Sequence, residues 1–456
     1  MKTTLCAVLV LMASACSKQF DEYGVNPNAP ETASAPLLLS GAEVSTFATY
    51  SGQLARISSI LVQQTAGNQA QLQTIGEYVI GEGTIPNEWS TIYSGALISC
   101  RTLIDRYGDD NPHYLGMAKV LMALNFGAAT DMWGDIPFND ALRAQEGNFQ
   151  PKYDKQEEVL KGIQMLLDEA IAELSKPKSA NRFVPGADDI IFNGNAAAWI
   201  NAAYIIKARY ANRLSQVDAT GSATVALTNI AKVKADQPEM NAVFYNSAGN
   251  FNQWYDFLSS RVDYIKMGKY FVEYLKSTND PRLPFFVAKD EQGNYTGIAP
   301  EESDITGTSD PGPGIAAPDA PIPLATLTEA KFIEAEANLR LGKRAEAATA
   351  FNDAVSTSVQ RVTGQPIASA FKQAIASETA GSISLDKIIQ QKYVALFSQL
   401  EGYNDYRRTG LPQLKANQVA QQKVIPVRLP TPQTERNYNK NATVVSDIYQ
   451  PLWWDK

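Results

Sequence analysis

The sequence predicts a mainly α-helical protein, built from helical hairpins in one scaffold with long irregular loops. Apolar residues recur at three- and four-residue steps over several long segments, which is the period of an amphipathic helix. Proline and glycine gather between these segments rather than inside them. Of the 456 residues, 45% are hydrophobic, so the chain can bury a sizeable core.

The first residues predict a targeting signal and a lipid anchor. Lys2 precedes an uncharged apolar run that is too short to cross a bilayer, which takes about 20 residues. Small residues end this run just before Cys16, a junction that resembles the bacterial lipoprotein signal; the alternative is an ordinary signal peptide with a chance cysteine. We expect residues 1–15 to be the signal peptide and 16–36 a tether lipidated at Cys16. Residues 37–456 then form a single helical domain held on a membrane without crossing it.

The clearest helical pattern covers residues 154–174, where apolar side chains line one face and charged side chains the other. Asp154 and Glu157 have the spacing of a capping box, so Asp154 is the expected N-cap. Further helices are expected over 113–132, 195–214, 328–341, 344–359 and 385–400.

Residues around Gly342 predict a specific kind of hairpin. Gly342, Ala347, Phe351 and Ala354 follow one another at spacings of five, four and three. These small and aromatic positions match the second half of a tetratricopeptide repeat, in which small residues let two helices approach and phenylalanine fills the space between them. The scaffold is therefore expected to be partly solenoidal.

One long segment, 290–324, is expected to be a functional or mobile loop. It contains six Pro, five Gly and seven Asp or Glu, and it has no Lys or Arg. Such a composition predicts no regular element, and a loop of this length inside a compact protein is uncommon without a function.

Composition argues against several classes of function. A net charge of −8 argues against nucleic acid as the main partner, because phosphate binding needs clustered Lys and Arg. His113 is the single histidine, which excludes a zinc site that needs two. No phosphate-binding glycine loop and no Cys–His metal spacing occurs. We therefore expect no cofactor, no metal and no catalytic residue. Cys100 is expected to be buried, and no disulfide is expected.

Capture of a neutral sugar needs flat aromatic surfaces together with amides and carboxylates that bond hydroxyl groups. The segment 249–258 has this chemistry, with Gln253 and Asp256 beside the candidates. Its expected ligand-binding residues are Asn252, Trp254 and Tyr255. The alternative interpretation is that Phe251, Trp254 and Phe257 form a core stripe at three-residue steps.

A second candidate segment, 66–89, is rich in side-chain amides. Its expected ligand-binding residues are Asn68, Gln71 and Tyr78. Trp89 and Tyr93 follow four residues apart on an expected helix, where packing against the core is the better interpretation.

Other polar residues are expected to be structural. Asp131 and Asp135 flank a predicted helix end, so a shared catalytic face is not expected. Arg407 and Arg408 are expected to bond buried carbonyls or carboxylates rather than an anionic ligand. His113 follows a proline at a helix start, where a surface position is expected.

Short motifs follow one another over nearly the whole chain. In order they are Asn26-Pro27-Asn28, residues 130–138 (TDMWGDIPF), 151–156 (PKYDKQ), 279–282 (NDPR), Ala335-Glu336-Ala337, 401–410 (EGYNDYRRTG) and 425–429 (IPVRL). In this order they resemble the SusD/RagB family of outer-membrane nutrient-binding lipoproteins, in particular its shorter SusD-like branch.

The resemblance implies a surface-exposed lipoprotein of the cell outer membrane that is not an enzyme. It implies a partner, a SusC-like TonB-dependent transporter for which such a protein acts as a lid, and a ligand that is an oligosaccharide or, in some members, a peptide. Two other hypotheses stay open. One is a secreted helical glycosidase with paired carboxylates, and the other is a helical-repeat scaffold that binds only peptide or protein.

Overall fold

The computed structural model of the protein describes residues 33–455. The expected signal peptide, Cys16 and most of the expected tether lie outside the described residues. The first helix among the described residues, α2, begins at Ala35. Within the described part of the chain, no helix combines the length and the apolar character that crossing a bilayer requires.

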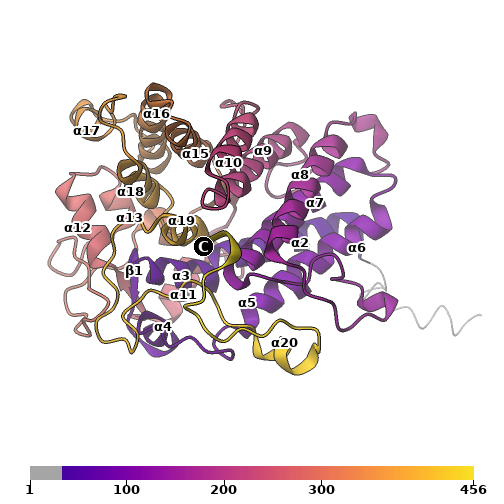
Figure 1. Cartoon of the computed structure of the whole chain (residues 1–456), viewed down its shortest axis with the longest axis horizontal. Helices are drawn as coiled ribbons and strands as arrows, with labels where there is room; N and C mark the ends of the chain where they lie inside the picture. The colour runs from indigo at the N-terminus through magenta and orange to yellow at the C-terminus, as the bar shows by residue number, and fades with distance from the viewer. Residues whose placement is uncertain (1–32, 456) are drawn as a thin grey trace, which may run out of the picture.

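The fold is mainly helical, as the sequence predicted (Figure 1). The elements of the first half are α2 (Ala35–Ser51), α3 (Gln53–Leu61), β1 (Thr65–Gly67), α4 (Ala70–Gly76), α5 (Pro86–Ser90), the π-helix η1 (Thr91–Leu97), α6 (Ile98–Tyr107), α7 (Pro112–Trp133), η2 (Ala144–Glu146), α8 (Gln156–Leu174), η3 (Lys178–Ala180), α9 (Ala196–Arg213) and α10 (Ala219–Ile230). The elements of the second half are β2 (Met240–Ala242), α11 (Gln253–Ser260), β3 (Ile265–Met267), α12 (Lys269–Ser277), α13 (Leu283–Phe286), α14 (Pro313–Ala316), β4 (Ile322–Ala325), α15 (Leu327–Arg340), α16 (Arg344–Thr363), α17 (Ser369–Ile375), α18 (Leu385–Ala395), α19 (Leu400–Thr409), α20 (Gln433–Tyr438) and η4 (Trp453–Asp455).

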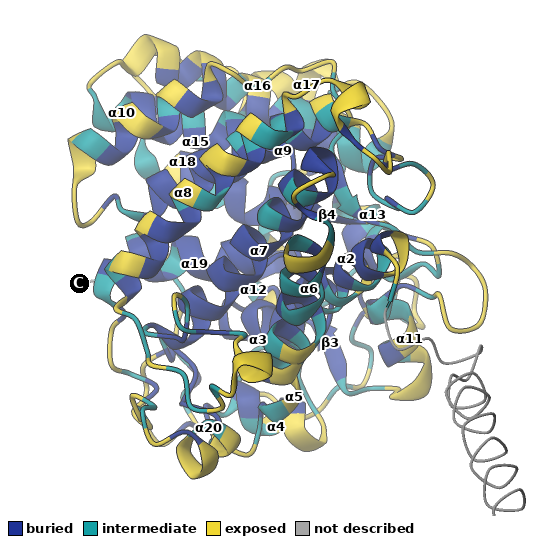
Figure 2. Cartoon of the chain, turned by 90° about the vertical axis from the view of Figure 1, so that its right-hand side faces the viewer, coloured by how far each residue is buried: buried dark blue, intermediate teal, exposed yellow. Residues whose placement is uncertain are grey.

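Helix α7 lies at the centre of the core. None of its residues is exposed, because apolar and small side chains cover every side of the helix (Figure 2). Helices α2, α6 and α8 pack against it, and α9 packs on α8. Cys100 of α6 is buried, as expected.

The expected hairpin around Gly342 is confirmed. Helices α15 and α16 pack side by side, and Gly342 makes the turn between them at φ +74°, a conformation that favours glycine. Phe351 meets Phe332 edge-on with ring centroids 6.3 Å apart, and Ala347 and Ala354 are fully buried. Helices α7 and α8, and α9 and α10, form further pairs of this kind.

Two boundaries differ from the sequence prediction. Asp154 does not cap α8, because its carboxylate accepts hydrogen bonds from the backbone N–H groups of Phe138 and Asn139. Asp135 takes its place and accepts from the N–H of Gln156, the first residue of α8. The expected helix over 385–400 ends earlier, at Ala395, as α18; a turn that contains the left-handed residue Ser398 at φ 68° follows, and α19 starts at Leu400.

The expected loop 290–324 is irregular over most of its length, but it contains regular structure that the composition did not predict. Helix α14 lies inside it, and its last residues form β4, which pairs antiparallel with β2. The strand β4 tolerates Pro323, because this proline lies where the pairing of β2 with β4 shifts in register.

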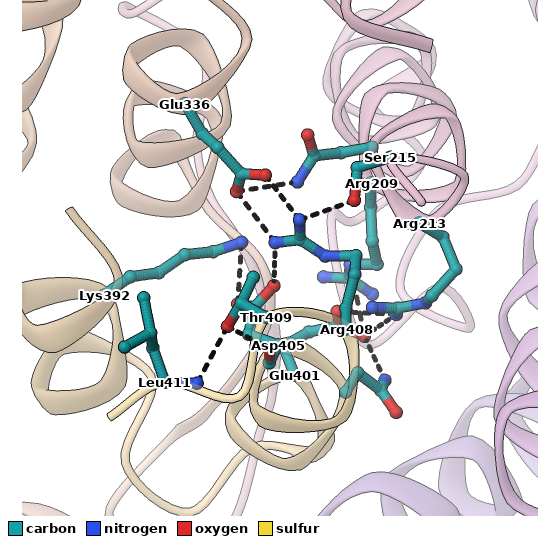
Figure 3. A network of polar contacts seen from close by, with 12 residues as sticks. Arg209, Arg213, Ser215, Glu336, Lys392, Glu401, Asp405, Arg408, Thr409 and Leu411 are labelled. Atoms are coloured by element: carbon teal, nitrogen blue, oxygen red, sulfur yellow. Dashed lines mark hydrogen bonds and ion pairs between the residues drawn. The ribbon is translucent and has the colours of Figure 1, made fainter. Parts of the chain in front are cut away.

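A buried network of charged side chains joins helices that are far apart in sequence (Figure 3). Arg213 of α9 bonds Asp131 of α7 at 3.0 Å and Glu401 of α19 at 2.6 Å. Arg408 of α19 bonds Glu336 of α15 at 2.5 Å. Further pairs in the same network are Arg209–Glu329, Arg408–Asp405 and Lys392–Asp405.

This network explains several of the sequence motifs. The motif 130–138 supplies Asp131, the motif around Ala335 supplies Glu336, and the motif 401–410 supplies Glu401, Asp405 and Arg408. Arg407 bonds the backbone carbonyls of Asp131 and Val427. The expectation that Arg407 and Arg408 bond buried carbonyls or carboxylates is therefore confirmed.

His113 is the clearest failure among the single-residue predictions. Its side chain is buried rather than at the surface, and its Nε2 lies 2.8 Å from the carbonyl oxygen of Lys176. Its backbone N–H donates to Asn181 Oδ1 at 2.8 Å. The start of α7 is covered by the 176–181 segment, which proximity to Pro112 in sequence could not reveal.

Candidate functional site

A short antiparallel ladder brings the two candidate segments together. Thr65 of β1 pairs with Met267 of β3, and Gly67 pairs with Ile265. Just beyond the ladder, the N–H of Asn68 donates to the carbonyl of Tyr264. Because α4 and α5 follow β1 and α11 precedes β3, this pairing places the segment 66–89 beside the segment 249–258.

A cavity of about 340 Å³ lies where these segments meet. Helices α3, α4, α5 and α11 contribute to it, and they lie together at the lower edge of Figure 1. Its walls are mostly polar, and its lining residues are Gln53, Arg56, Gln71, Thr84, Asn87, Glu88, Gln253, Asp256, Phe257 and Arg261. We call it the amide cavity.

Arg56 forms the buried wall of the amide cavity. The residue is only 8% exposed, although α3 carries no other charge. Its guanidinium donates three long hydrogen bonds, two to Gln53 Oε1 at 3.3 and 3.4 Å and one to the carbonyl of Gln253 at 3.3 Å. Burial lowers the pKa of this guanidinium to about 10, so it stays protonated at neutral pH.

The buried ring of Phe257 of α11 lies close to two guanidinium groups. The Arg56 guanidinium lies 4.2 Å from the ring centroid, and that of the exposed Arg261 lies 5.2 Å from it. Tyr264 holds the ring edge-on, with centroids 6.1 Å apart. The ring is therefore fixed by its neighbours rather than free to turn.

Gly52 allows the tight junction of α2 and α3 behind this wall. It joins α2 to α3, and a Cβ atom at this position would lie 2.7 Å from Gln253 Oε1 and 2.4 Å from the carbonyl oxygen of Ala48. Both contacts are closer than real Cβ atoms show. Glycine is required here for the close contact between the helices.

Three polar side chains of the cavity are free to bind a ligand. The side chains of Gln71, Asn87 and Asp256 make no hydrogen bond with any other described residue, and Asn87 and Asp256 are exposed. Glu88 is different, since its Oε2 is enclosed without a partner and burial raises the pKa of its carboxyl. Amides and a carboxylate are the groups that bond sugar hydroxyls.

Of the six residues expected to bind ligand, Gln71 lines the amide cavity. Trp254 is fully buried, with its ring centroid 6.4 Å from that of Phe397. Asn252 is also buried; its Oδ1 caps the N-terminus of α11 and its Nδ2 donates to the carbonyl of Ala320. The burial of Trp254 matches the alternative core interpretation, and the side chain of Asn252 is already bonded, so the proposed site does not include these two residues.

The other three expected residues lie outside the lining of the cavity. Tyr255 is half-buried and meets Phe251 edge-on at 5.2 Å. Tyr78 is buried, and its hydroxyl accepts from the N–H of Asn417. The side chain of Asn68 donates to the carbonyl of Ala66 within its own turn. Ligand contact by these three stays a prediction.

The sequence analysis missed Arg56, Glu88 and Arg261. Arg56 did carry a signal, because it is the only Lys or Arg between Lys18 and Arg101. A lone cation within an apolar helix needs a special environment, and here that environment is the cavity wall.

Asp131 and Asp135 are not a pair of neighbouring carboxylates. Asp131 is buried against Arg213, whereas Asp135 bonds Lys155 at the surface, so the two carboxylates do not share a face, as expected. Trp89 stacks on Tyr93 with centroids 4.5 Å apart, which confirms that the two residues pack together.

A second, larger cavity of about 490 Å³ lies between α12, α17, α18 and residues 411–413. Tyr270 and Tyr274 line it, but their hydroxyls already bond the side chains of Gln390 and Gln391. Lys387 and Glu378 at its rim pair with each other. With its polar groups largely paired, this cavity offers fewer free bonding groups than the amide cavity.

Comparison with known proteins agrees with the fold and the motifs. A sequence profile described as “Starch-binding associating with outer membrane” matches residues 27–432. The chain belongs to this SusD-like family. The resemblance found in the short motifs is therefore confirmed, and with it the association of the family with the outer membrane. No curated protein matches the chain.

Solved structures of SusD-like proteins share the fold. A SusD homologue from Bacteroides fragilis has a TM-score of 0.77 at 20% identity, over 92% of this chain and 100% of that one. A SusD/RagB family protein from Bacteroides thetaiotaomicron has a TM-score of 0.73 at 23% identity, over 93% and 99%. A chitin-binding SusD homologue from Flavobacterium johnsoniae has a TM-score of 0.76 at 19% identity, over 92% and 98%.

Proposed function

We propose that this SusD-like protein captures an oligosaccharide in the amide cavity and delivers it to an outer-membrane transporter. The observation that carries the proposal is the set of unbonded polar side chains around the fixed ring of Phe257. The starch-binding description of the family and the chitin-binding relative support a sugar as the ligand. A peptide would use the same amides and is the other ligand to test.

The cavity assignment is tested by removing its free amides. The double variant Gln71→Ala, Asn87→Ala should lower the affinity for the bound glycan by about tenfold, because each net hydrogen bond contributes about 0.5–1.5 kcal/mol. Calorimetry of the mature protein in mild detergent, against a panel of glycans and peptides, measures it. Gln373→Ala, an exposed glutamine on α17, is the matched control. Full affinity in the double variant would place the ligand elsewhere.

We further propose that Cys16 is acylated and that the protein forms the lid of a SusC-like TonB-dependent transporter at the cell surface. Cys16→Ala should then move the protein from the membrane to the soluble fraction, whereas an unchanged distribution would contradict the anchor. Affinity purification after mild detergent extraction should recover a large β-barrel partner. Repeated recovery of the protein alone would argue against the lid.

A glycosidase remains the competing proposal, because Glu88 and Asp256 both line the amide cavity. The raised pKa of Glu88 is a property that a general acid needs. We assign both groups to ligand hydroxyls, since family membership favours binding over cleavage. Incubation with each bound glycan should yield no shorter product, and a product lost in Glu88→Gln would establish the enzyme instead.

A further inference from the structure

We propose that the captured oligosaccharide carries an anionic substituent, a carboxylate or a sulfate, which Arg56 and Arg261 bind at the face of Phe257. The inference rests on the proposed function, because it names the ligand class of the same cavity. It departs from the neutral sugar that the amide-rich segments suggested.

Arg56 is unusual among the buried arginines of residues 33–455. Four of the others bond a carboxylate within 3.0 Å: Arg209, Arg213, Arg282 and Arg408. The remaining two, Arg407 and Arg428, have short bonds to backbone carbonyls. Arg56 has only amide oxygens as partners, at 3.3 Å or more. The N–H groups of its guanidinium that face the cavity therefore lack a strong hydrogen-bond acceptor.

Arg261 adds a second positive charge beside the first. Both guanidinium groups lie near the ring of Phe257, and the ring attracts each of them without neutralising either. Burial is the main cause of the lowered pKa of Arg56, and the like charge of Arg261 adds to it. The more distant charges of Glu88 and Asp256 oppose this shift without forming an ion pair. An anion bound between the two guanidinium groups would remove their repulsion, and a carboxylate or sulfate can accept two N–H bonds at once.

The carboxylates of the cavity do not supply that anion. Within the described residues, no carboxylate oxygen lies within 4.0 Å of a guanidinium nitrogen of Arg56 or Arg261. Asp256 is exposed to water, which weakens its field. Burial favours the neutral form of the Glu88 carboxyl. The anion position beside Phe257 is thus left to a ligand.

Matched pairs of sugars test the inference, because the two members of each pair share one sugar backbone and differ in whether it carries the anionic group. The first pair is an oligogalacturonate and its methyl ester, and the second is a sulfated galactose oligosaccharide and its desulfated form. In at least one pair the anionic form should bind at least tenfold more tightly than the neutral form. This preference should shrink as salt rises from 50 to 500 mM. The pair that shows it identifies carboxylate or sulfate.

Arg261→Gln is the informative variant, because Arg261 is exposed and its loss leaves the core intact. It should reduce the preference for the anionic form, measured as the ratio of the affinities for the two members of a pair, at least threefold. The matched control is Arg182→Gln, since Arg182 is also exposed and its guanidinium lies 5.3 Å from the centroid of the Phe183 ring.

The outcomes separate the two proposals. Tight binding of neutral sugars, with no preference for charge and no effect of Arg261→Gln, overturns the anionic ligand and leaves glycan capture standing. Binding of no sugar from the panel, charged or neutral, overturns both.

Discussion

Glu43 shows how one buried residue sets a pH dependence. It is fully buried beside Asp189, whose carboxylate accepts from three backbone N–H groups and from the indole of Trp199. Glu43 accepts only from the N–H of Ile190, and its Oε1 has no partner. Burial, together with the charge of Asp189, raises the pKa of Glu43 from 4.5 to about 10. The carboxyl group of Glu43 is therefore protonated at neutral pH.

The sign of the pH effect follows from that proton. Below pH 4.5 both the folded and the unfolded chain carry it, and between pH 4.5 and about 10 only the folded chain does. The free energy of unfolding therefore falls as pH rises through this window, by at most about 1.4 kcal/mol per pH unit for one proton. Glu43→Gln keeps a neutral donor and should remove this slope.

Urea denaturation of the wild type and of Glu43→Gln at pH 6, 7, 8 and 9 measures the difference. All other titrating groups are common to both proteins, so the difference between the two curves reports Glu43 alone. Parallel curves would show that Glu43 is ionised in the folded state.

The burial or role of a single residue was predictable from the sequence where it depends on residue type and not on which segments pack against it. The burial of Cys100 and the structural role of Arg407 follow from residue type. The burial of His113 and the cavity position of Arg56 depend on segments that cover them from elsewhere in the chain.

At the scale of elements, Ser398 determines that α18 and α19 are two helices. Its φ of 68° lies in the left-handed region, and its buried hydroxyl has no partner. The break directs Phe397 toward Phe271, with ring centroids 4.7 Å apart. Sequence periodicity continued through 385–400, because apolar spacing does not report a reversal at one residue.

Replacing Ser398 should change stability in a defined order. Ser398→Gly relieves the strain of the left-handed backbone and removes a hydroxyl that has no partner, which together should stabilise the folded state by about 1–3 kcal/mol. The greater backbone entropy of glycine in the unfolded chain should offset about 0.5–1 kcal/mol of this gain. Ser398→Gly should therefore raise the free energy of unfolding by about 1 kcal/mol. Ser398→Val should lower it by about 2 kcal/mol or more, since a β-branched residue tolerates positive φ poorly.

Ser398→Ala serves as the control that removes only the hydroxyl. Chemical denaturation gives all three values, and a glycine variant less stable than the wild type would show that the strain is smaller than assumed. The N-terminus of α8 shows the same limit of sequence spacing. Asp135, rather than the expected capping residue Asp154, accepts from the N–H of Gln156, and spacing along the sequence could not indicate this.

At the scale of the whole molecule, the buried ion network ties α7, α9, α15, α18 and α19 into one unit. Arg408 is central to it, because it joins Glu336 of the tetratricopeptide-like hairpin to the C-terminal part of the chain. Desolvated charges of this kind are held by their mutual geometry, so removing one leaves the others unpaired.

Arg408→Met should therefore lower the free energy of unfolding by about 3–5 kcal/mol. Arg101→Met, which breaks the exposed pair with Asp105, should cost less than about 1 kcal/mol. Circular dichroism and tryptophan fluorescence, recorded together during denaturation, should give one coincident transition for the wild type. A loss in Arg408→Met no larger than in the control would mean that the network does not hold the helices together.

Much of the fold was predictable, and less of the site. Periodicity gave the helices that build the hairpins, and the motifs gave the family. Both amide-rich segments were identified, but their meeting depends on the pairing of Thr65 with Met267, which local patterns do not encode. The wall residue Arg56 comes from α3, a helix that the sequence analysis did not predict, and Glu88 precedes Trp89, for which packing was expected.

The contrast between the bonded network and the unbonded cavity has a consequence for how such proteins diversify. Mutation of either Arg213 or Glu401 leaves the charge of the other buried without a partner, so selection must retain both residues. Gln71, Asn87 and Asp256 bond nothing else in the described chain, so they can be exchanged at little cost to folding. A lineage can therefore drift from one sugar to another through a few substitutions around Phe257, while the inherited scaffold stays the same.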